Sequence, residues 1–202
     1  MKPFPTEYVP SVATLQSDEL SDAGKRAFET LAARGYAVTL GLTKAAAAKI
    51  QEIARQDSIR EYCPNDVGSR FRDEAGTTTW LGKGRAVFLL VESATGEIAG
   101  YAWGGAAQTS HIPGGETTVA LRLSEKHQGK GLATPYLAVA VDATQQLYGA
   151  KNLWLETWAS NTGAVHIYEK IGFTQVASEP STRPTINGTL TPDTRLYMMF
   201  SQ

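Results

Sequence analysis

The chain has 202 residues with 42% hydrophobic and 19% charged side chains, a composition typical of a globular protein that is long enough to bury a core. Nineteen lysines and arginines against twenty aspartates and glutamates give a net charge of -1, which argues against a protein whose main task is binding a nucleic-acid backbone. A single cysteine (Cys63), an N-terminus without a signal-peptide core and the lack of any window of about eighteen apolar residues favour a cytoplasmic protein with no disulfide and no membrane partner.

The N-terminal part of the sequence predicts two helices with one strand between them. Residues 1–17 contain three prolines and no clear period, so we expect an extended lead-in. A helix over residues 21–34, a strand over 36–42 and a second helix over 44–56 follow. A serine or threonine stands before each helix as a cap, and a glycine ends the first one.

The middle of the chain changes from an irregular segment to a hairpin. Residues 57–84 mix turn formers with isolated aromatics, which predicts one short helix among loops that could bind a substrate. Residues 86–92 and 97–103 are apolar runs separated by Ser-Ala-Thr-Gly, and this pattern is typical of two antiparallel strands.

The second half of the chain alternates strands and helices. The predicted elements are a loop at 108–115, strands at 117–123 and 152–158, helices at 132–148 and 162–170, and a closing antiparallel pair at 173–178 and 194–200. We expect a proline-rich loop over residues 179–193 to join the last two strands.

A Gly-rich loop lies between the strand at 117–123 and the helix at 132–148. Glycines let the backbone close around an anion, and the helix start adds partial positive charge, so the loop predicts a pyrophosphate site. A Walker loop is excluded because Ser124 replaces its first Gly and Gly131 follows Lys130. A dinucleotide fingerprint is excluded because Thr134 replaces the third Gly. A plain connecting turn is the alternative.

A second motif follows the strand at 152–158. Asn161, Ala164 and Tyr168 are spaced i, i+3, i+7, so they share one face of a short helix. The runs Gln-x-x-Gly-x-Ala and Asn-x-x-Ala-x-x-x-Tyr-Glu-Lys-x-Gly-Phe together resemble the GNAT superfamily of acetyl-CoA-dependent N-acetyltransferases. The stretch Leu-Trp-Leu-Glu before the second run is most similar to the ribosomal-protein alanine N-acetyltransferases.

This resemblance implies an α+β fold with three layers, in which a mixed, mostly antiparallel sheet of about seven strands has helices on both faces. We expect one acetyltransferase domain over residues 1–202, with an N-terminal extension at 1–34 and the core at 35–202. By the same resemblance the protein is a monomer or a homodimer and binds acetyl-CoA (coenzyme A). We expect no metal, because no pair of histidines has the spacing of metal ligands.

The resemblance also assigns roles to residues. Tyr168 would donate a proton to the departing thiolate, and Asn161 would contact the pantetheine arm, which backbone groups of Leu121 and Leu123 would hold. The pyrophosphate would lie on a loop of six residues, namely Gln128, Gly129, Lys130, Gly131, Leu132 and Ala133. The alternatives are a core aromatic for Tyr168 and a simple helix cap for Asn161.

Acetyl transfer to an amine also needs a base, because an ammonium has no lone pair with which to attack. Glu156 is the first candidate, since alternation places it on the same face as Trp154 and Trp158, and the alanine acetyltransferases use a glutamate at this place. Glu116 is the second candidate, and water alone is a third. Either glutamate is otherwise a surface charge.

The acceptor is predicted to be a small amine or a protein amino group, bound by residues 57–84 and 104–115. A cationic small acceptor would need acidic side chains, and this part of the chain offers Glu61, Asp66, Asp73 and Glu74. A non-catalytic acyl-CoA-binding sensor is the alternative from another class of protein.

Overall fold

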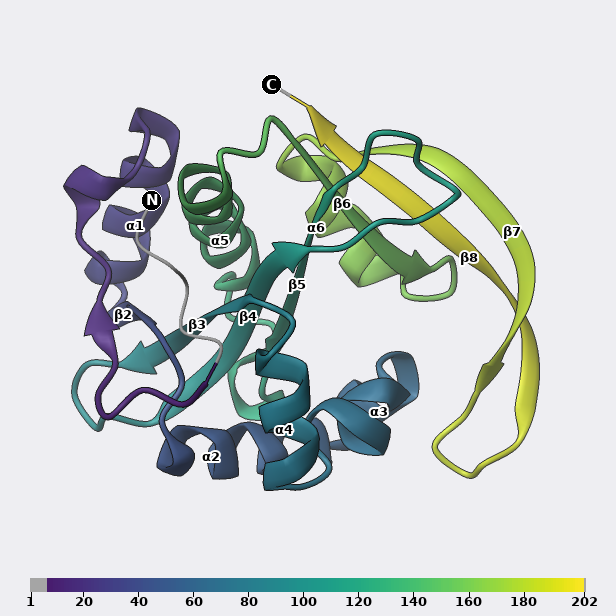
Figure 1. Ribbon diagram of the computed structural model, residues 1–202, viewed down its shortest axis with the longest axis horizontal. Helices are drawn as coiled ribbons and strands as arrows, with labels where there is room; N and C mark the ends of the chain where they lie inside the picture. Colours follow the sequence, from purple (N-terminus) through teal and green to yellow (C-terminus); the bar gives the residue numbers. More distant parts are fainter. Residues whose placement is uncertain (1–6, 202) are drawn as a thin grey trace.

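One eight-stranded sheet forms the centre of the structure, a computed structural model that describes residues 7–201 (Figure 1). Its strand order is β1-β2-β3-β4-β5-β6-β8-β7. The strands are β1 (Ala13–Thr14), β2 (Tyr36–Leu40), β3 (Arg85–Glu92), β4 (Ile98–Ala106), β5 (Thr117–Leu123), β6 (Asn152–Trp158), β7 (Thr174–Pro184) and β8 (Leu190–Ser201). All neighbours are antiparallel except β5 and β6, so the expected mixed, mostly antiparallel sheet is confirmed.

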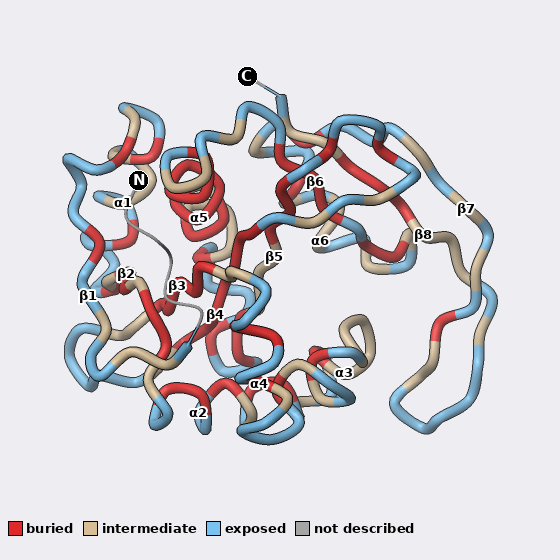
Figure 2. The backbone as a smooth tube through the Cα atoms, in the orientation of Figure 1, coloured by how far each residue is buried: buried red, intermediate tan, exposed pale blue. Residues whose placement is uncertain are grey.

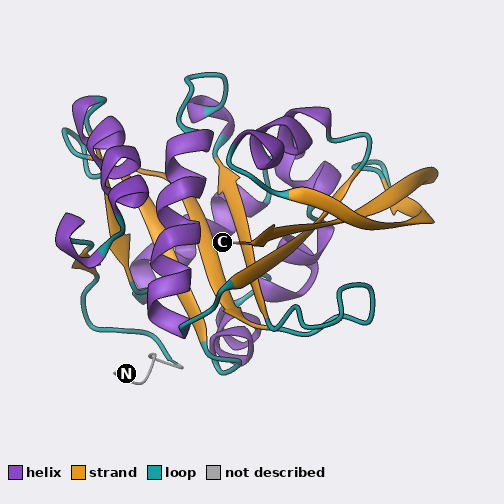
Figure 3. Ribbon diagram, turned by 90° about the horizontal axis from the view of Figure 1, so that it is seen from above, coloured by secondary structure: helices purple, strands orange, loops and turns teal. Residues whose placement is uncertain are grey.

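Helices cover both faces of this sheet (Figure 3). They are α1 (Asp22–Ala33), α2 (Lys44–Ala54), α3 (Asp57–Tyr62), α4 (Glu74–Leu81), α5 (Ala133–Tyr148) and α6 (Thr162–Lys170), with short turns η1 (Ser17–Glu19), η2 (Asp66–Arg70) and η3 (Glu125–His127). α1 packs on α5 on one face, while α2 and α4 lie on the other. None of the helices within residues 7–201 is long and apolar enough to cross a bilayer.

Two apolar clusters fill the space between the sheet and the helices (Figure 2). Strand alternation divides the residues of β3 between them, because successive side chains point to opposite faces. Phe88 and Leu90 belong to the cluster beneath α5, and Val87 and Leu89 belong to the cluster beneath α2. The central strands are therefore buried on both faces and hold the rim of the sheet rigidly.

The parallel strands β5 and β6 diverge along most of their length. They pair at Thr118 and Trp154, while the rest of β5 pairs with β4 and the rest of β6 with β8. The divergence leaves a wedge between two neighbouring strands. The wedge is open toward the loop that precedes α5.

The β7–β8 hairpin corrects one expectation. Residues 179–193 were expected to form a proline-rich loop, but the strands continue to Pro184 and from Leu190. Proline has no backbone N–H and therefore cannot donate to a neighbouring strand. It is tolerated in β7 because β7 is the outermost strand of the sheet and has no neighbour on its outer side. The hairpin extends away from the sheet as a long arm (Figure 1).

Residues 57–84 are more helical than the sequence predicted. Where one short helix was expected, the structure has α3, η2 and α4. These elements have only five to eight residues each, too few to show a clear period in the sequence. Local contacts define them instead, for example the Asp73 carboxylate that accepts a hydrogen bond from the backbone N–H of Gly76 at 2.7 Å and caps α4.

Candidate functional site

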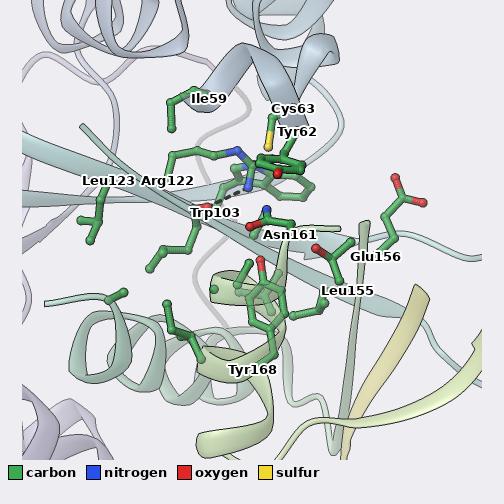
Figure 4. A pocket seen from close by; sticks show the side chains of 18 of the residues that line it. Ile59, Tyr62, Cys63, Trp103, Arg122, Leu123, Leu155, Glu156, Asn161 and Tyr168 are labelled. Atoms are coloured by element: carbon green, nitrogen blue, oxygen red, sulfur yellow. Dashed lines mark hydrogen bonds between the residues drawn. The ribbon is translucent and has the colours of Figure 1, made fainter. Parts of the chain in front are cut away.

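A cavity of about 650 Å³ opens where β5 and β6 diverge. Its walls come from β4, β5 and β6, from α3, from the loop before α5 and from the start of α6 (Figure 4). The predicted site residues that line it are Leu121, Leu123, Gln128, Gly129, Gly131, Leu132, Ala133, Glu156, Asn161 and Tyr168. Lys130 is exposed and lies outside this lining.

The Gly-rich loop has the backbone that an anion site requires. Gly129 and Gly131 have φ of 72° and 69°, in the left-handed region that glycine adopts without strain. The loop leads into α5, whose first turn has free N–H groups and a partial positive charge. Arg34, which the sequence did not single out, supports the loop by donating to the carbonyls of Lys130 at 3.1 Å and Gly131 at 2.9 Å.

Two side chains tie the loop and the cavity to β5. Gln128 Nε2 donates to the carbonyl of Leu123 at 3.0 Å and to Ser58 Oγ at 2.9 Å, which joins the loop to both β5 and α3. Arg122 Nη1 donates to the carbonyl of Leu121 at 2.7 Å. The backbone of β5 thus lies at the cavity wall, and side chains donate hydrogen bonds to its Leu121 and Leu123 carbonyls.

Tyr168 places its hydroxyl in the cavity. The hydroxyl points toward Asn161 (Figure 4), although the residue as a whole is only 8% exposed. Burial raises the pKa of Tyr168 to about 12, with Arg122 acting in the opposite direction. The phenol therefore keeps its proton at neutral pH, as a proton donor must. Tyr168 thus belongs to the apolar cluster beneath α5 and also lines the cavity.

Asn161 stands at the position before α6, as predicted, but its side chain makes no capping hydrogen bond to the helix. Backbone hydrogen bonds begin the helix instead: the N–H groups of Ala164 and Val165 donate to the Asn161 carbonyl. The amide is left to line the cavity opposite Tyr168 (Figure 4). The simple helix-cap interpretation of this side chain is therefore wrong.

The two candidate bases occupy different places. Glu156 lines the cavity at its outer rim, with its side chain 42% exposed and Arg195 Nη1 3.5 Å from its Oε1 (Figure 4). Its carboxylate points away from the Tyr168 hydroxyl, so the two groups approach the cavity from different sides. Glu116 is exposed and lines a separate, smaller hollow near Gly149. The geometry favours Glu156 of the two.

A buried charge network lies behind the cavity, and no pattern in the sequence indicates it. Asp66 is fully buried and accepts hydrogen bonds from Arg70 Nη1 at 2.8 Å, Arg122 Nε at 3.0 Å and the Tyr101 hydroxyl at 2.8 Å. Burial alone would raise the pKa of the Asp66 carboxyl, but Arg122 and Arg70 outweigh it and hold that pKa below its usual value. Cys63 lies beside this network, and burial raises the pKa of its thiol, so it is not an activated nucleophile.

The four acidic residues that favoured a cationic acceptor do not serve one. Asp66 is neutralised in the network, Asp73 caps α4, and Glu74 pairs with Lys44. Glu61 forms an ion pair with Arg183 of β7. Within residues 7–201, no three histidine, cysteine, aspartate or glutamate side chains converge where a metal ion could be held.

The Glu61–Arg183 pair fastens the β7–β8 hairpin to α3. Arg183 donates to the Glu61 carbonyl at 2.8 Å, lies 4.8 Å over the Tyr62 ring and bonds to Asp193 at 3.1 Å. Ile186, in the hairpin turn, donates its backbone N–H to Glu61 at 3.1 Å. The hairpin arm is thereby fastened to α3, and Tyr62 of α3 becomes part of the cavity wall.

Sequence comparison relates this chain to proteins of known activity. A sequence model described as the acetyltransferase (GNAT) family matches residues 47–173, more than half of the chain. An N-alpha-acetyltransferase from Sulfurisphaera tokodaii is 29% identical over 98 residues, which are 45% of this chain and 58% of that protein. A streptothricin acetyltransferase from Streptomyces lavendulae is 27% identical over 129 residues, 61% of each protein. The chain thus matches about three fifths of the length of these curated relatives.

Structure comparison gives the same fold. The spermidine N-acetyltransferase from Vibrio cholerae, solved in complex with CoA and spermine, superposes with a TM-score of 0.66 at 20% identity. The match covers 82% of this chain and 95% of that one. At this identity the likeness concerns the arrangement of strands and helices.

Proposed function

This chain belongs to the acetyltransferase (GNAT) family, as the two sequence motifs indicated, and from that premise we propose that it transfers an acetyl group from acetyl-CoA to an amine. The observation that carries the proposal is the meeting of three features in one cavity. These are the wedge between β5 and β6, the Gly-rich loop at the start of α5 and the protonated Tyr168.

The residues present fit acetyl-CoA. The positive φ angles of Gly129 and Gly131 and the N-terminus of α5 suit a pyrophosphate. The wall of β5 from Leu121 to Leu123 suits an amide-bearing arm, which would bind as a peptide binds to a strand edge. Lys130, although outside the cavity lining, is positioned on the same loop and adds positive charge there. When bound, acetyl-CoA supplies an acetyl group activated as a thioester.

The protein's own groups then handle the protons. Glu156 would accept the proton of the attacking amine, directly or through a water, since its carboxylate is at the rim of the cavity where water has access. Tyr168 Oη would give its proton to the departing sulfur, and Asn161 would position the arm beside it. The transfer would be direct, within a complex that holds both substrates at once.

A protein amino group is a second candidate acceptor, and the ribosomal-protein alanine acetyltransferase subtype belongs with it. The relation to the N-alpha-acetyltransferase from Sulfurisphaera tokodaii supports this candidate. The cavity volume of about 650 Å³, which has to hold the cofactor arm as well, favours a small acceptor over a polypeptide.

Acetyl-CoA at saturating concentration is expected to raise the melting temperature of the protein, and coenzyme A should do nearly the same, because a ligand that binds only the folded state stabilises it by mass action. At about 100 times Kd the gain is about 2.7 kcal/mol, or roughly 5–10 °C for a chain of this size. Scanning fluorimetry measures it, with ATP as the control. No shift with acetyl-CoA would remove the pyrophosphate site and the acetyl transfer with it.

Replacement of Glu156 by glutamine is expected to lower kcat/KM about 10²-fold, at the lower end of the range for a general base, because water at this exposed rim can partly replace it. Glu116→Gln is the matched control and should leave kcat/KM within twofold. Thiol release from acetyl-CoA measures both. If Glu116→Gln loses activity and Glu156→Gln does not, Glu116 is the base. If neither variant loses activity, solvent alone accepts the proton.

A further inference from the structure

A group of unpaired hydrogen-bond donors lies in the cavity wall, on the face of the sheet covered by α2 and α4. Trp103 of β4 is only 6% exposed, and its indole Nε1 has no hydrogen-bond partner among residues 7–201. The guanidinium groups of Arg85 and Arg70 lie 5.3 Å and 5.2 Å from the centre of the Trp103 ring. The Nε of Arg85 is also buried and unpaired. Buried donors without partners cost free energy, so this arrangement indicates an acceptor that the ligand brings.

The charges around the cavity are mainly positive. Its charged lining residues are Arg70, Arg85, Arg122, Arg195 and Glu156. Asp66 lies beneath them and is shared by Arg70 and Arg122, while Glu156 is beside Arg195. Four positive and two negative charges leave a formal charge of +2. Arg85 is the arginine of this group with no carboxylate partner among the ion pairs of residues 7–201.

The position of these donors separates them from the phosphates of the cofactor. Along the sheet, Arg85 is level with Gly105 and Thr118, and Trp103 is level with Ala120. The Gly-rich loop begins beyond Leu123, five residues from Thr118, which is roughly 17 Å along a strand. The donors therefore lie at the closed end of the wedge, where β5 and β6 still pair at Thr118 and Trp154. An acceptor has to meet the acetyl group at that end.

The acceptor is also small. The cavity volume of about 650 Å³ has to hold the cofactor arm as well as the acceptor. Tyr62 of α3, over whose ring the Arg183 guanidinium lies, is part of its wall. Indole N–H groups and planar guanidinium groups together suit the two in-plane oxygens of a carboxylate, and arginine binds such a group in a bidentate fashion.

We propose that Trp103, Arg85 and Arg70 form a subsite for the carboxylate of the acceptor, so that this enzyme acetylates a small amine that also carries a carboxylate, such as an amino acid. The proposal rests on the acetyl transfer proposed above and names its substrate class. A polyamine such as spermine, bound by the solved Vibrio cholerae structure, is the opposite class of acceptor. Its positive charges would face Arg85 and Arg70.

The test compares amino acids with the amines that they give on loss of the carboxylate, using the full chain and acetyl-CoA. Suitable pairs are phenylalanine with phenethylamine and 6-aminohexanoate with pentylamine, and spermidine and phosphoethanolamine complete the panel. We expect kcat/KM, measured by thiol release, to be at least tenfold higher for the carboxylate member of a pair. Preference for spermidine or for the plain amines would overturn the proposal, and preference for phosphoethanolamine over 6-aminohexanoate would replace the carboxylate with a phosphate.

Two variants link the preference to the subsite. Trp103→Phe keeps an aromatic side chain, although a smaller one, and removes the indole N–H, and Arg85→Gln removes the positive charge that has no carboxylate partner in the described part of the chain. Each should lower kcat/KM for the amino acid about tenfold more than for its amine partner, mainly through KM. Arg26→Gln, an exposed arginine on α1, removes the same charge away from the cavity and should change neither. An equal loss for both members of a pair would show that Trp103 and Arg85 are structural.

A binding measurement tests the carboxylate subsite separately from the proposed acetyl transfer. Calorimetric titration of 6-aminohexanoate and pentylamine into protein saturated with coenzyme A needs no turnover. Tighter binding of 6-aminohexanoate, weakened in Arg85→Gln, would support the subsite even if no thiol were released. Thiol release with every amine and no difference in binding would overturn the subsite and leave the acetyl transfer standing.

Discussion

Replacement of Tyr168 by phenylalanine is expected to lower kcat about 10³-fold, within the range for loss of a general acid, while the KM for acetyl-CoA changes less than twofold. The reason is that the phenylalanine keeps the ring that packs 6.1 Å from Phe173 and removes only the hydroxyl that points into the cavity. Steady-state thiol release measures kcat, and fluorimetry with acetyl-CoA measures binding. A variant with kcat within twofold of the parent would exclude Tyr168 from the mechanism.

The pH dependence provides an independent check on the same residue. An ordinary tyrosine loses its proton near pH 10, whereas burial raises the pKa of Tyr168 to about 12. The donor therefore stays protonated up to about pH 11, and kcat should show no alkaline decline from this group between pH 8 and 10.5. Tyr136→Phe is the matched control. This variant removes a buried hydroxyl that donates to the Phe88 carbonyl at 2.9 Å. Tyr136 does not line the cavity, so kcat should remain close to that of the parent protein.

The parts of the fold that local chemistry determines were predictable from the sequence. β5 and β6 begin and end where alternation and the flanking turn residues placed them. α1 and α2 have the predicted caps, with Gly24 N donating to Ser21 Oγ at 3.3 Å and Ala46 N donating to Thr43 Oγ1 at 3.1 Å. The cavity gathers the predicted residues because two motifs on neighbouring parallel strands necessarily meet at the same edge of the sheet.

What the sequence could not reveal depends on contacts between distant segments. Arg34 and Gly131 are 97 positions apart, and Glu61 and Arg183 are 122 apart, so no local pattern relates them. The prolines of β7 indicate a loop unless it is known that this strand is the sheet edge. Asp66 stands in a run of turn-forming residues and looks like a solvated acid, although the fold buries it completely.

Replacement of Asp66 by asparagine is expected to lower the free energy of unfolding by about 3–5 kcal/mol, the usual cost of leaving buried charges without their partner. Asparagine has nearly the same shape, so the loss comes from the missing charge between Arg70 and Arg122 and from the Tyr101 hydroxyl that donates to Asp66. For a chain of this size the melting temperature should fall by roughly 10–15 °C. Urea unfolding at pH 7 measures the free energy. Asp18→Asn, an exposed aspartate in η1, should stay within about 0.5 kcal/mol of the parent.

The free energy of unfolding at low pH shows whether Asp66 stabilises the protein through its charge or through its packing. Because Arg122 and Arg70 hold its pKa in the folded state below the unfolded value of about 3.9, its contribution is complete above that value and is lost as pH falls through the folded pKa. The difference between the parent and Asp66→Asn should therefore be constant from pH 5 to 8 and shrink below about pH 4. A difference that stays the same at pH 3 would mean that asparagine disturbs packing around Tyr101, not the charge balance. A shrinking difference would show that this carboxylate fixes Arg122, and with it the strand that forms one wall of the cavity.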